Sequence, residues 1–164
     1  MDFKKLANQY RNELLDNVLP FWLEHSQDLE FGGYFSCLDR EGKVFDTDKF
    51  IWLQGREVWM FSMLYNKVEK RQEWLDCAVQ GGEFLKKYGH DGNYNWYFSL
   101  DRSGRPLVEP YNIFSYTFAT MAFGQLSLAT GNQEYADIAK KTFEIILSKV
   151  IIRKASGTRF IRYS

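Results

Sequence analysis

One short segment of the chain occurs twice, and this repeat constrains the fold more than any other feature. The segment Tyr34–Gly42 reads YFSCLDREG, and Tyr97–Gly104 repeats it as YFSLDRSG. Asp39 thereby corresponds to Asp101, which lies 62 residues further along. Helical patterns flank each copy, so each unit is a helix, a small hairpin and a helix. Repeated helical pairs bury their apolar faces only against neighbouring pairs, which builds arrays or closed toroids.

The spacing of apolar residues predicts five helices around the two hairpins. Pro20 is expected to kink or end the first helix, and Gly131 to separate the last two. A hairpin that recurs at one end of each unit fits a toroid whose loops gather at the mouth of a central cavity. We therefore expect a mainly α fold, a helical toroid with short β-hairpins at one end. The predicted helices cover residues 3–18, 52–68, 74–88, 114–126 and 135–147.

Size and charge exclude several classes of protein. The chain has 164 residues, which is enough for one domain with a real core. Its net charge of +0, from 21 basic and 21 acidic residues, argues against an electrostatic binder of nucleic acid or of a membrane surface. No apolar stretch is long enough to span a bilayer. The two cysteines, Cys37 and Cys77, are too few for a disulfide framework, and no cluster has metal-ligand spacing, so we expect reduced thiols in a cytoplasmic protein without a metal.

An arginine on an apolar helical face is the strongest candidate for a functional side chain. In the segment WLQGREVWMF (52–61), helical spacing places Arg56 on one stripe with Trp52 and Trp59. The guanidinium would then point into the core or a cavity, where it must meet a carboxylate or a polar ligand. An arginine among tryptophans is typical of a sugar site, because rings stack on sugar faces and the guanidinium binds oxygens. The alternative is a core arginine paired with a distant acid.

Four longer segments carry a resemblance to a known family. They are WLQGREVWMFSMLYN (52–66), GGEFLKKYG (81–89), DRSGRPL (101–107) and IFSYTFATMAFGQLSLATGN (113–132). Together they resemble the N-acylglucosamine 2-epimerase family, which includes the renin-binding proteins and, more distantly, the cellobiose 2-epimerases. The resemblance covers residues 1 to about 150 and implies the N-terminal part of an (α/α)6 barrel. With about five helices of twelve, the barrel would be truncated.

The resemblance also implies a reaction, which is epimerisation at C2 of a reducing sugar without a redox cofactor. Removal of the C2 proton gives an enediolate, and a proton then returns to the opposite face. The family's arginine at this motif steadies the negative oxygen, and that residue is Arg56 here. Trp52, Trp59 and Phe118 would line the cavity. Gln54 and Gly55 follow the acylglucosamine branch, which favours N-acetylglucosamine and N-acetylmannosamine as the substrate pair.

The acid/base groups are expected outside this chain. The family's histidines for that role lie on later helices, and His25 and His90 are interpreted as exposed bystanders. We therefore expect no turnover by this chain alone. A carboxylate pair of Asp39 and Asp101 for glycoside hydrolysis is a weaker hypothesis, since Asp is favoured in turns. An aldose–ketose isomerase of the same fold, and a non-catalytic carbohydrate-binding or protein-interaction module, are also compatible with the sequence.

Three further expectations concern assembly, regulation and the end of the chain. The resemblance implies a possible homodimer and a nucleotide effector, although no residue pattern here indicates a nucleotide site. After Val150 the resemblance stops, and residues 151–159 lack helical patterning. We therefore expect that residues 151–164 are an unmatched tail produced by a frameshift.

Overall fold

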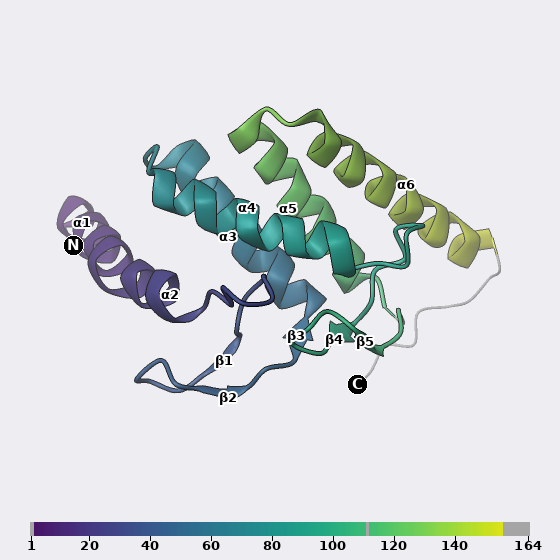
Figure 1. Cartoon of the computed structure of the whole chain (residues 1–164). Helices are drawn as coiled ribbons and strands as arrows, with labels where there is room; N and C mark the ends of the chain where they lie inside the picture. Colours follow the sequence, from purple (N-terminus) through teal and green to yellow (C-terminus); the bar gives the residue numbers. More distant parts are fainter. Residues whose placement is uncertain (1, 111, 156–164) are drawn as a thin grey trace, which may run out of the picture.

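The computed structural model of the chain describes residues 2–110 and 112–155, and it is mainly helical (Figure 1). Short strands form two small antiparallel sheets on one side of the helices. The sheets are β1–β2 and β3–β4–β5. The helices are α1 (Phe3–Glu13), the π-helical turn η1 (Leu14–Val18), α2 (Leu19–His25), α3 (Ile51–Lys67), α4 (Gln72–Tyr88), α5 (Phe114–Thr130) and α6 (Gln133–Ala155); the strands are β1 (Cys37–Leu38), β2 (Val44–Asp46), β3 (Lys49–Phe50), β4 (Ser99–Leu100) and β5 (Pro106–Val108).

The first predicted helix is irregular before Pro20, as the position of this residue indicated. Asp2 caps α1 by accepting hydrogen bonds from the backbone N–H groups of Lys4 and Lys5. The helix then widens into the π-helical turn η1, directly before Pro20 near the start of α2. Proline lacks an N–H and its ring clashes with the preceding turn, which disrupts the regular hydrogen bonds of the helix here. The predicted disturbance at Pro20 is thus observed as a π-helical turn, and the helix does not end there but continues to His25.

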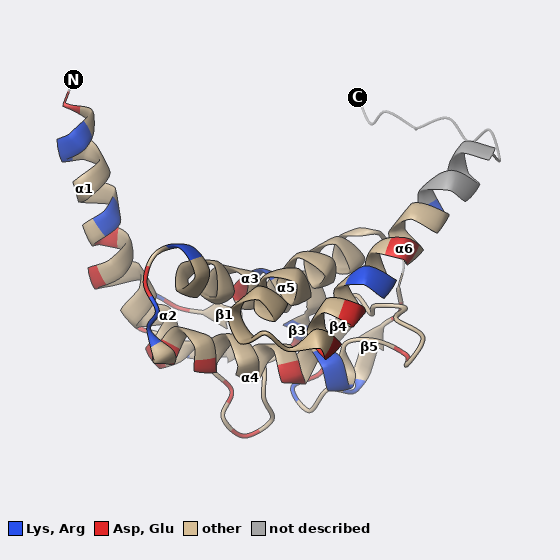
Figure 2. Cartoon of the chain, turned by 90° about the horizontal axis from the view of Figure 1, so that it is seen from above, with Lys and Arg blue, Asp and Glu red and all other residues tan. Residues whose placement is uncertain are grey.

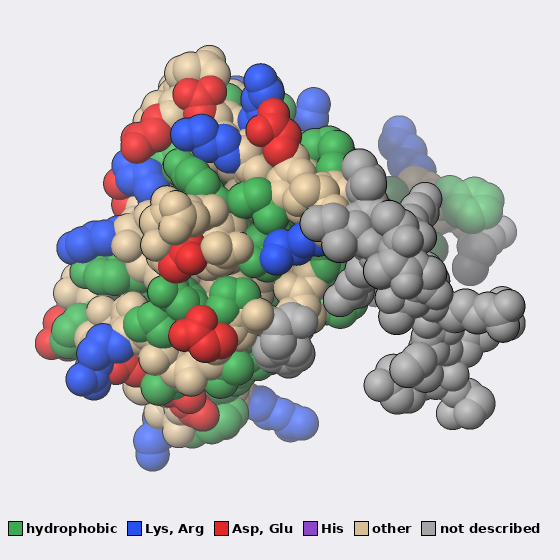
Figure 3. Space-filling model, turned by 90° about the vertical axis from the view of Figure 1, so that its right-hand side faces the viewer, with side chains coloured by type: hydrophobic (Ala, Val, Ile, Leu, Met, Phe, Trp, Pro, Cys, Tyr) green, Lys and Arg blue, Asp and Glu red, His purple; other side chains and the backbone are tan. Residues whose placement is uncertain are grey.

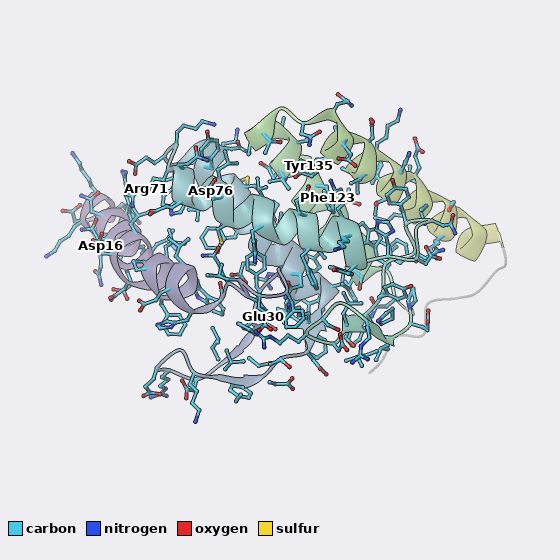
Figure 4. All side chains as sticks on the ribbon, in the orientation of Figure 1. Asp16, Glu30, Arg71, Asp76, Phe123 and Tyr135 are labelled. Atoms are coloured by element: carbon cyan, nitrogen blue, oxygen red, sulfur yellow. The ribbon has the colours of Figure 1, made fainter. Side chains whose placement is uncertain are left out.

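The four long helices form two layers. In Figure 2, α3 and α5 lie side by side with α4 beneath them, and α1 and α6 extend from opposite ends of the molecule. Gly131, in the left-handed conformation (φ 72°), ends α5 and allows the tight return into α6. Phe123 of α5 and Tyr135 of α6 pack between these helices with ring centroids 5.8 Å apart (Figure 4).

A single core joins α3, α4, α5 and the loops before them. Trp74 and Trp96 are its largest apolar members, and both are completely buried. Tyr34 reaches into the same core from the loop after α2, and its hydroxyl donates to the carbonyl oxygen of Cys77 at 2.7 Å. Cys37 and Cys77 are both free thiols. The described helices include none that is long and apolar enough to cross a membrane.

The repeated segments form the two hairpins, and the repeated aspartates organise their turns. Asp39 Oδ1 accepts from the backbone N–H groups of Glu41 and Lys43, and Asp101 Oδ1 accepts from that of Arg105. The turn interpretation of both aspartates is therefore confirmed. The strand expected before the first turn is shorter than the alternation suggested, because only Cys37 and Leu38 pair with β2.

The helical pattern continues further than the sequence indicated. The helix α6 runs through Ala155, so the expectation that helical structure ends after Val150 is wrong for residues 151–155. Residues 156–164 lie outside the described part of the chain. The frameshift origin of residues 151–164 remains a prediction.

Apolar side chains remain uncovered on α5 and α6. Figure 3 shows the α6 end of the molecule, where hydrophobic side chains lie between charged ones. The largest exposures on these helices are at Phe114 (61%), Met121 (38%), Leu128 (69%), Phe143 (49%) and Leu147 (45%). On α5, Phe114, Phe118, Met121 and Leu128 follow helical spacing along one face. This face of α5 therefore carries several exposed apolar side chains.

Candidate active site

Three of the predicted site residues meet where α3 and α5 run side by side. The ring of Phe118, on α5, lies 6.0 Å from the ring of Trp52, on α3. One turn further along α3, the guanidinium carbon of Arg56 lies 5.9 Å from the centroid of the same Phe118 ring. Phe118 therefore contacts both the tryptophan and the cation, at the edge of cation–π range.

A pocket opens beside this cluster. It has a volume of about 280 Å³, which is near the lower end for small-molecule sites, and it is open to solvent. Its walls are mostly aromatic, with one side-chain amide. The lining residues are Trp52, Phe98, Asn112, Phe114 and Phe118. Aromatic faces with a neighbouring amide and a guanidinium form a surface suited to a polar organic molecule that also has apolar faces.

The expectation of a buried arginine is wrong. Arg56 is exposed, and within the described part of the chain no carboxylate forms an ion pair with it. The apolar stripe faces the open side of the inner helices, so the guanidinium reaches solvent across Phe118. The alternative of a core arginine paired with a distant acid is also wrong. Glu57, directly after Arg56, lies on a different face of α3, and its carboxyl group forms a hydrogen bond with the Ser26 hydroxyl.

Trp59, the fourth predicted site residue, lies apart from the other three. It lines a separate apolar groove toward the end of α3, together with Met60, Met63, Leu64, Lys67 and Val68. Two turns of helix separate Trp59 from Trp52. A role for Trp59 in binding sugar remains a prediction.

The pocket includes residues that sequence reasoning missed. Phe98, Asn112 and Phe114 were not assigned to a site, although they line the pocket. The repeat held a signal for one of them. The 62-residue offset that relates Asp39 to Asp101 also relates Trp52 to Phe114 and Arg56 to Phe118. Trp52 and Phe114 therefore stand at equivalent positions of the repeat, and both line the pocket.

A buried charge cluster fixes the strands next to the pocket. Asp28 and Lys49 have completely buried side chains, and Asp28 Oδ2 accepts from Lys49 Nζ at 3.0 Å and from Arg102 Nε at 2.9 Å. Lys49 Nζ also donates to the carbonyl oxygens of Gly32 (2.5 Å) and Arg102 (2.9 Å). The cluster joins three segments: the loop after α2, strand β3 and the β4–β5 turn. Glu30 extends it at the surface with a 3.0 Å ion pair to Arg102 (Figure 4).

The cluster also shifts the pKa of its buried carboxyl group. Desolvation of Asp28 raises its pKa, but the hydrogen bonds from Arg102 and Lys49 outweigh that effect and lower the pKa to about 2. Desolvation lowers the pKa of Lys49, against the opposing effect of Asp28. Because Lys49 directly precedes Phe50 and α3, the cluster sets where α3 begins. Strand β4, next to Phe98, pairs with β3 and is fixed by the same cluster.

Neither histidine faces the pocket. His25 stacks against Phe21 with ring centroids 4.9 Å apart, and His90 lies between Tyr94 and Trp96 at 4.7 and 4.8 Å. Both are half-buried, so the expectation that they are exposed is wrong. Burial lowers the pKa of His90. Among the described residues, no group of three or more His, Cys, Asp or Glu side chains could hold a metal ion.

The arrangement of the helices and hairpins defines the class of fold. An inner layer of α3 and α5, outer helices behind it and hairpins at one end form a segment of an (α/α)6 barrel, the fold of the solved sugar epimerases that it resembles. One of these, cellobiose 2-epimerase from Bacillus thermoamylovorans B4167, superimposes with a TM-score of 0.80 at 31% identity. That match covers 87% of this chain and 37% of the other chain.

The sequence comparisons then identify the family. Residues 33–161 match the family model described as N-acylglucosamine 2-epimerase (GlcNAc 2-epimerase), and the chain belongs to this family. An N-acylglucosamine 2-epimerase of Mus musculus is 45% identical over 137 residues, which are 81% of this chain and 33% of the mouse protein. The human protein of the same name is 44% identical over 137 residues, which are 81% of this chain and 32% of that protein.

The chain spans about a third of the length of these curated relatives. The family match runs past residue 150, where the sequence suggested a boundary, and that boundary remains a prediction.

Proposed function

We propose that this chain supplies part of the site of a sugar 2-epimerase that interconverts N-acetylglucosamine and N-acetylmannosamine. One observation carries the proposal. The Arg56 guanidinium lies over the Phe118 ring beside an aromatic pocket, in a chain of the N-acylglucosamine 2-epimerase family. Curated relatives with 44–45% identity have the name N-acylglucosamine 2-epimerase, which supports this substrate pair over a disaccharide.

The geometry suggests a division of roles between the side chains. Trp52 and Phe118 offer ring faces on which the apolar face of an open-chain or cyclic sugar can stack. Arg56 offers several N–H donors at the edge of that surface. Loss of the C2 proton places negative charge on the C1 oxygen, and a guanidinium at that oxygen stabilises the enediolate more than the neutral sugar. Arg56 therefore lowers the barrier to proton abstraction.

The proton transfers need groups from outside this chain. The sequence contains two histidines, and neither lines the pocket, since His25 packs against Phe21 and His90 against Trp96. Asp39 and Asp101 are occupied as turn-capping residues. We therefore assign binding and charge stabilisation to this chain, and proton abstraction and return to residues that complete the barrel.

Turnover in a protein that joins this chain to the rest of the barrel tests the proposal. That protein should interconvert the two N-acetylated sugars and incorporate deuterium at C2 when the reaction runs in D2O. Substituting Arg56→Ala should lower kcat about 100-fold or more, in the range seen when a donor to a developing oxyanion is removed. Arg40→Ala is the matched control, because Arg40 is exposed in the first hairpin turn and lies away from the pocket.

The outcomes separate the competing functions. Unchanged turnover of the Arg56→Ala protein would remove Arg56 from the site. Interconversion of an aldose and a ketose, without C2 inversion, would identify an isomerase that uses the same enediolate. Sugar binding without any exchange at C2 would identify a carbohydrate-binding module.

A further inference from the structure

The two residues before Arg56 do not line the pocket, yet both are buried. Gln54 is completely buried and bonds to the loop after α2. Its amide accepts from the backbone N–H of Tyr34 and donates to the carbonyl oxygen of Tyr34, both at 2.8 Å. This pair of hydrogen bonds holds the first turns of α3 against the loop. Gly55 points in another direction, toward α5.

At Gly55, α3 lies close against the backbone of α5 at Phe118. A Cβ atom added at this glycine would lie 3.0 Å from both the carbonyl carbon and the carbonyl oxygen of Phe118, and 3.1 Å from its Cβ. These distances are tighter than ordinary van der Waals contact. Two of the three atoms belong to the backbone of α5, which cannot rotate away as a side chain can. The distance between packed helices depends on the side chains at their contact, so the absence of a side chain here allows this approach.

The neighbours of Gly55 on α3 are the residues that contact the Phe118 ring. Trp52 lies three residues before it and Arg56 directly after it, and both lie about 6 Å from that ring. A displacement of α5 at Gly55 would therefore separate the cation and the tryptophan from the aromatic ring that joins them. We propose that Gly55 is a positioning residue, whose missing side chain sets the distance between Arg56 and the aromatic wall. This inference rests on the proposed sugar site.

The chain offers two matched glycines as controls. Gly124 lies on α5, and a Cβ there would meet nothing within 4 Å. Gly82 is buried on α4, and a Cβ there would clash with Cδ2 of Leu126, the far end of a flexible side chain. Gly82→Ala therefore displaces a core side chain that does not line the pocket. Gly124→Ala adds a methyl group that touches no neighbouring atom.

NMR can detect a change in the surroundings of the site residues in this chain. Two-dimensional NMR of the 15N-labelled protein would follow the indole N–H of Trp52 and the Nε–H of Arg56, assigned with Trp52→Phe and Arg56→Lys. Gly55→Ala should shift both resonances, because the ring current of Phe118 changes at each. Gly82→Ala and Gly124→Ala should leave both in place. A second arm titrates each variant with N-acetylglucosamine, and Gly55→Ala should weaken binding about tenfold relative to Gly124→Ala.

Two results would overturn the positioning role. One is a folded Gly55→Ala protein with both resonances unchanged. The other is an equal shift in Gly82→Ala, which would show a general response to core disturbance. If Gly55→Ala does not fold, the variant is repeated in the Gly124→Ala background, which gains helix propensity. Failure of that protein to fold, beside a folded Gly82→Ala, would assign Gly55 a structural role alone.

The two arms also separate this inference from the proposed function. If the unaltered chain gives no response to N-acetylglucosamine while Gly55→Ala still moves both resonances, the sugar assignment fails and the geometric role of Gly55 stands. If the sugar binds and the resonances do not depend on residue 55, the sugar assignment stands and the positioning role of Gly55 fails.

Discussion

The Glu57 carboxyl and the Ser26 hydroxyl form a hydrogen bond of 2.5 Å on the side of α3 that faces away from Arg56. The Ser26 oxygen also lies 2.6 Å from the carbonyl oxygen of Trp22, which accepts a hydrogen bond from it. A hydroxyl has a single hydrogen, so it cannot donate to both oxygens. A proton on Glu57 satisfies all three groups, because Glu57 then donates to Ser26 and Ser26 donates to Trp22.

Glu57 should make the stability of the protein fall as pH rises through the neutral range. Desolvation raises the pKa of Glu57 from 4.5 to about 8, against the opposing effect of Ser26. Below 4.5 the carboxyl is protonated in both folded and unfolded states. Between 4.5 and about 8 the unfolded chain releases the proton and the folded chain keeps it, which costs about 1.4 kcal/mol per pH unit at most. Urea denaturation of the wild type and Glu57→Gln at several pH values should show this slope only in the wild type. Equal slopes would show that Glu57 is already ionised in the folded protein.

The buried pair of Asp28 and Lys49 should be strongly coupled. Asp28→Asn leaves the Lys49 ammonium buried without its carboxylate, so we expect a loss of about 3–5 kcal/mol in the free energy of unfolding. Adding Lys49→Met to Asp28→Asn should restore part of that loss. A double-mutant cycle by chemical denaturation measures the coupling. Strictly additive losses would contradict a direct interaction between the two charges.

The two thiols should differ in reactivity. Cys77 is buried, and desolvation raises the pKa of its thiol, so little thiolate is available to react. Cys37 is only half-buried, at the start of the first hairpin. Iodoacetamide should therefore modify Cys37 first in the native protein, as peptide mass spectrometry would show. Modification of both at the same rate in native buffer would indicate that the core around Cys77 opens readily.

The same substitution should have opposite effects at a glycine inside α5 and at the glycine that ends this helix. Gly131 has φ 72°, a conformation that costs an L-residue about 1 kcal/mol, so Gly131→Ala should destabilise the protein. Gly124 is helical and has open space around it, so Gly124→Ala should stabilise by up to about 1 kcal/mol. Thermal denaturation of both variants would resolve the two signs. A stabilised Gly131→Ala protein would contradict the assigned role of Gly131 in ending α5.

The helices and turns could be predicted because their signals are local. The apolar spacing of α3 and α4, the disturbance at Pro20 and the break at Gly131 all reflect backbone rules that act within a few residues. The repeated aspartates also identified their turns correctly. The strands were less predictable, because Tyr34 and its neighbours alternate like a strand but are held by side chains, including the amide of Gln54.

The site could be predicted only in part. Helical spacing placed Trp52 and Arg56 together, but it could not show whether their shared face would be covered, and Arg56 proved to be exposed. The contribution of Phe98 depends on pairing between β3 and β4, which lie about 50 residues apart in the chain. The cluster of Asp28, Lys49 and Arg102 likewise depends on contacts across three distant segments. No local pattern indicates such contacts.

The 62-residue offset places Arg56 of one helix and Phe118 of the next at equivalent positions. The two copies of the repeated unit thus differ in chemistry at this position, with a charged group in the first and a ring in the second. A shared framework of hairpin and helix therefore leaves the chemistry of the surface to the individual side chains that it presents.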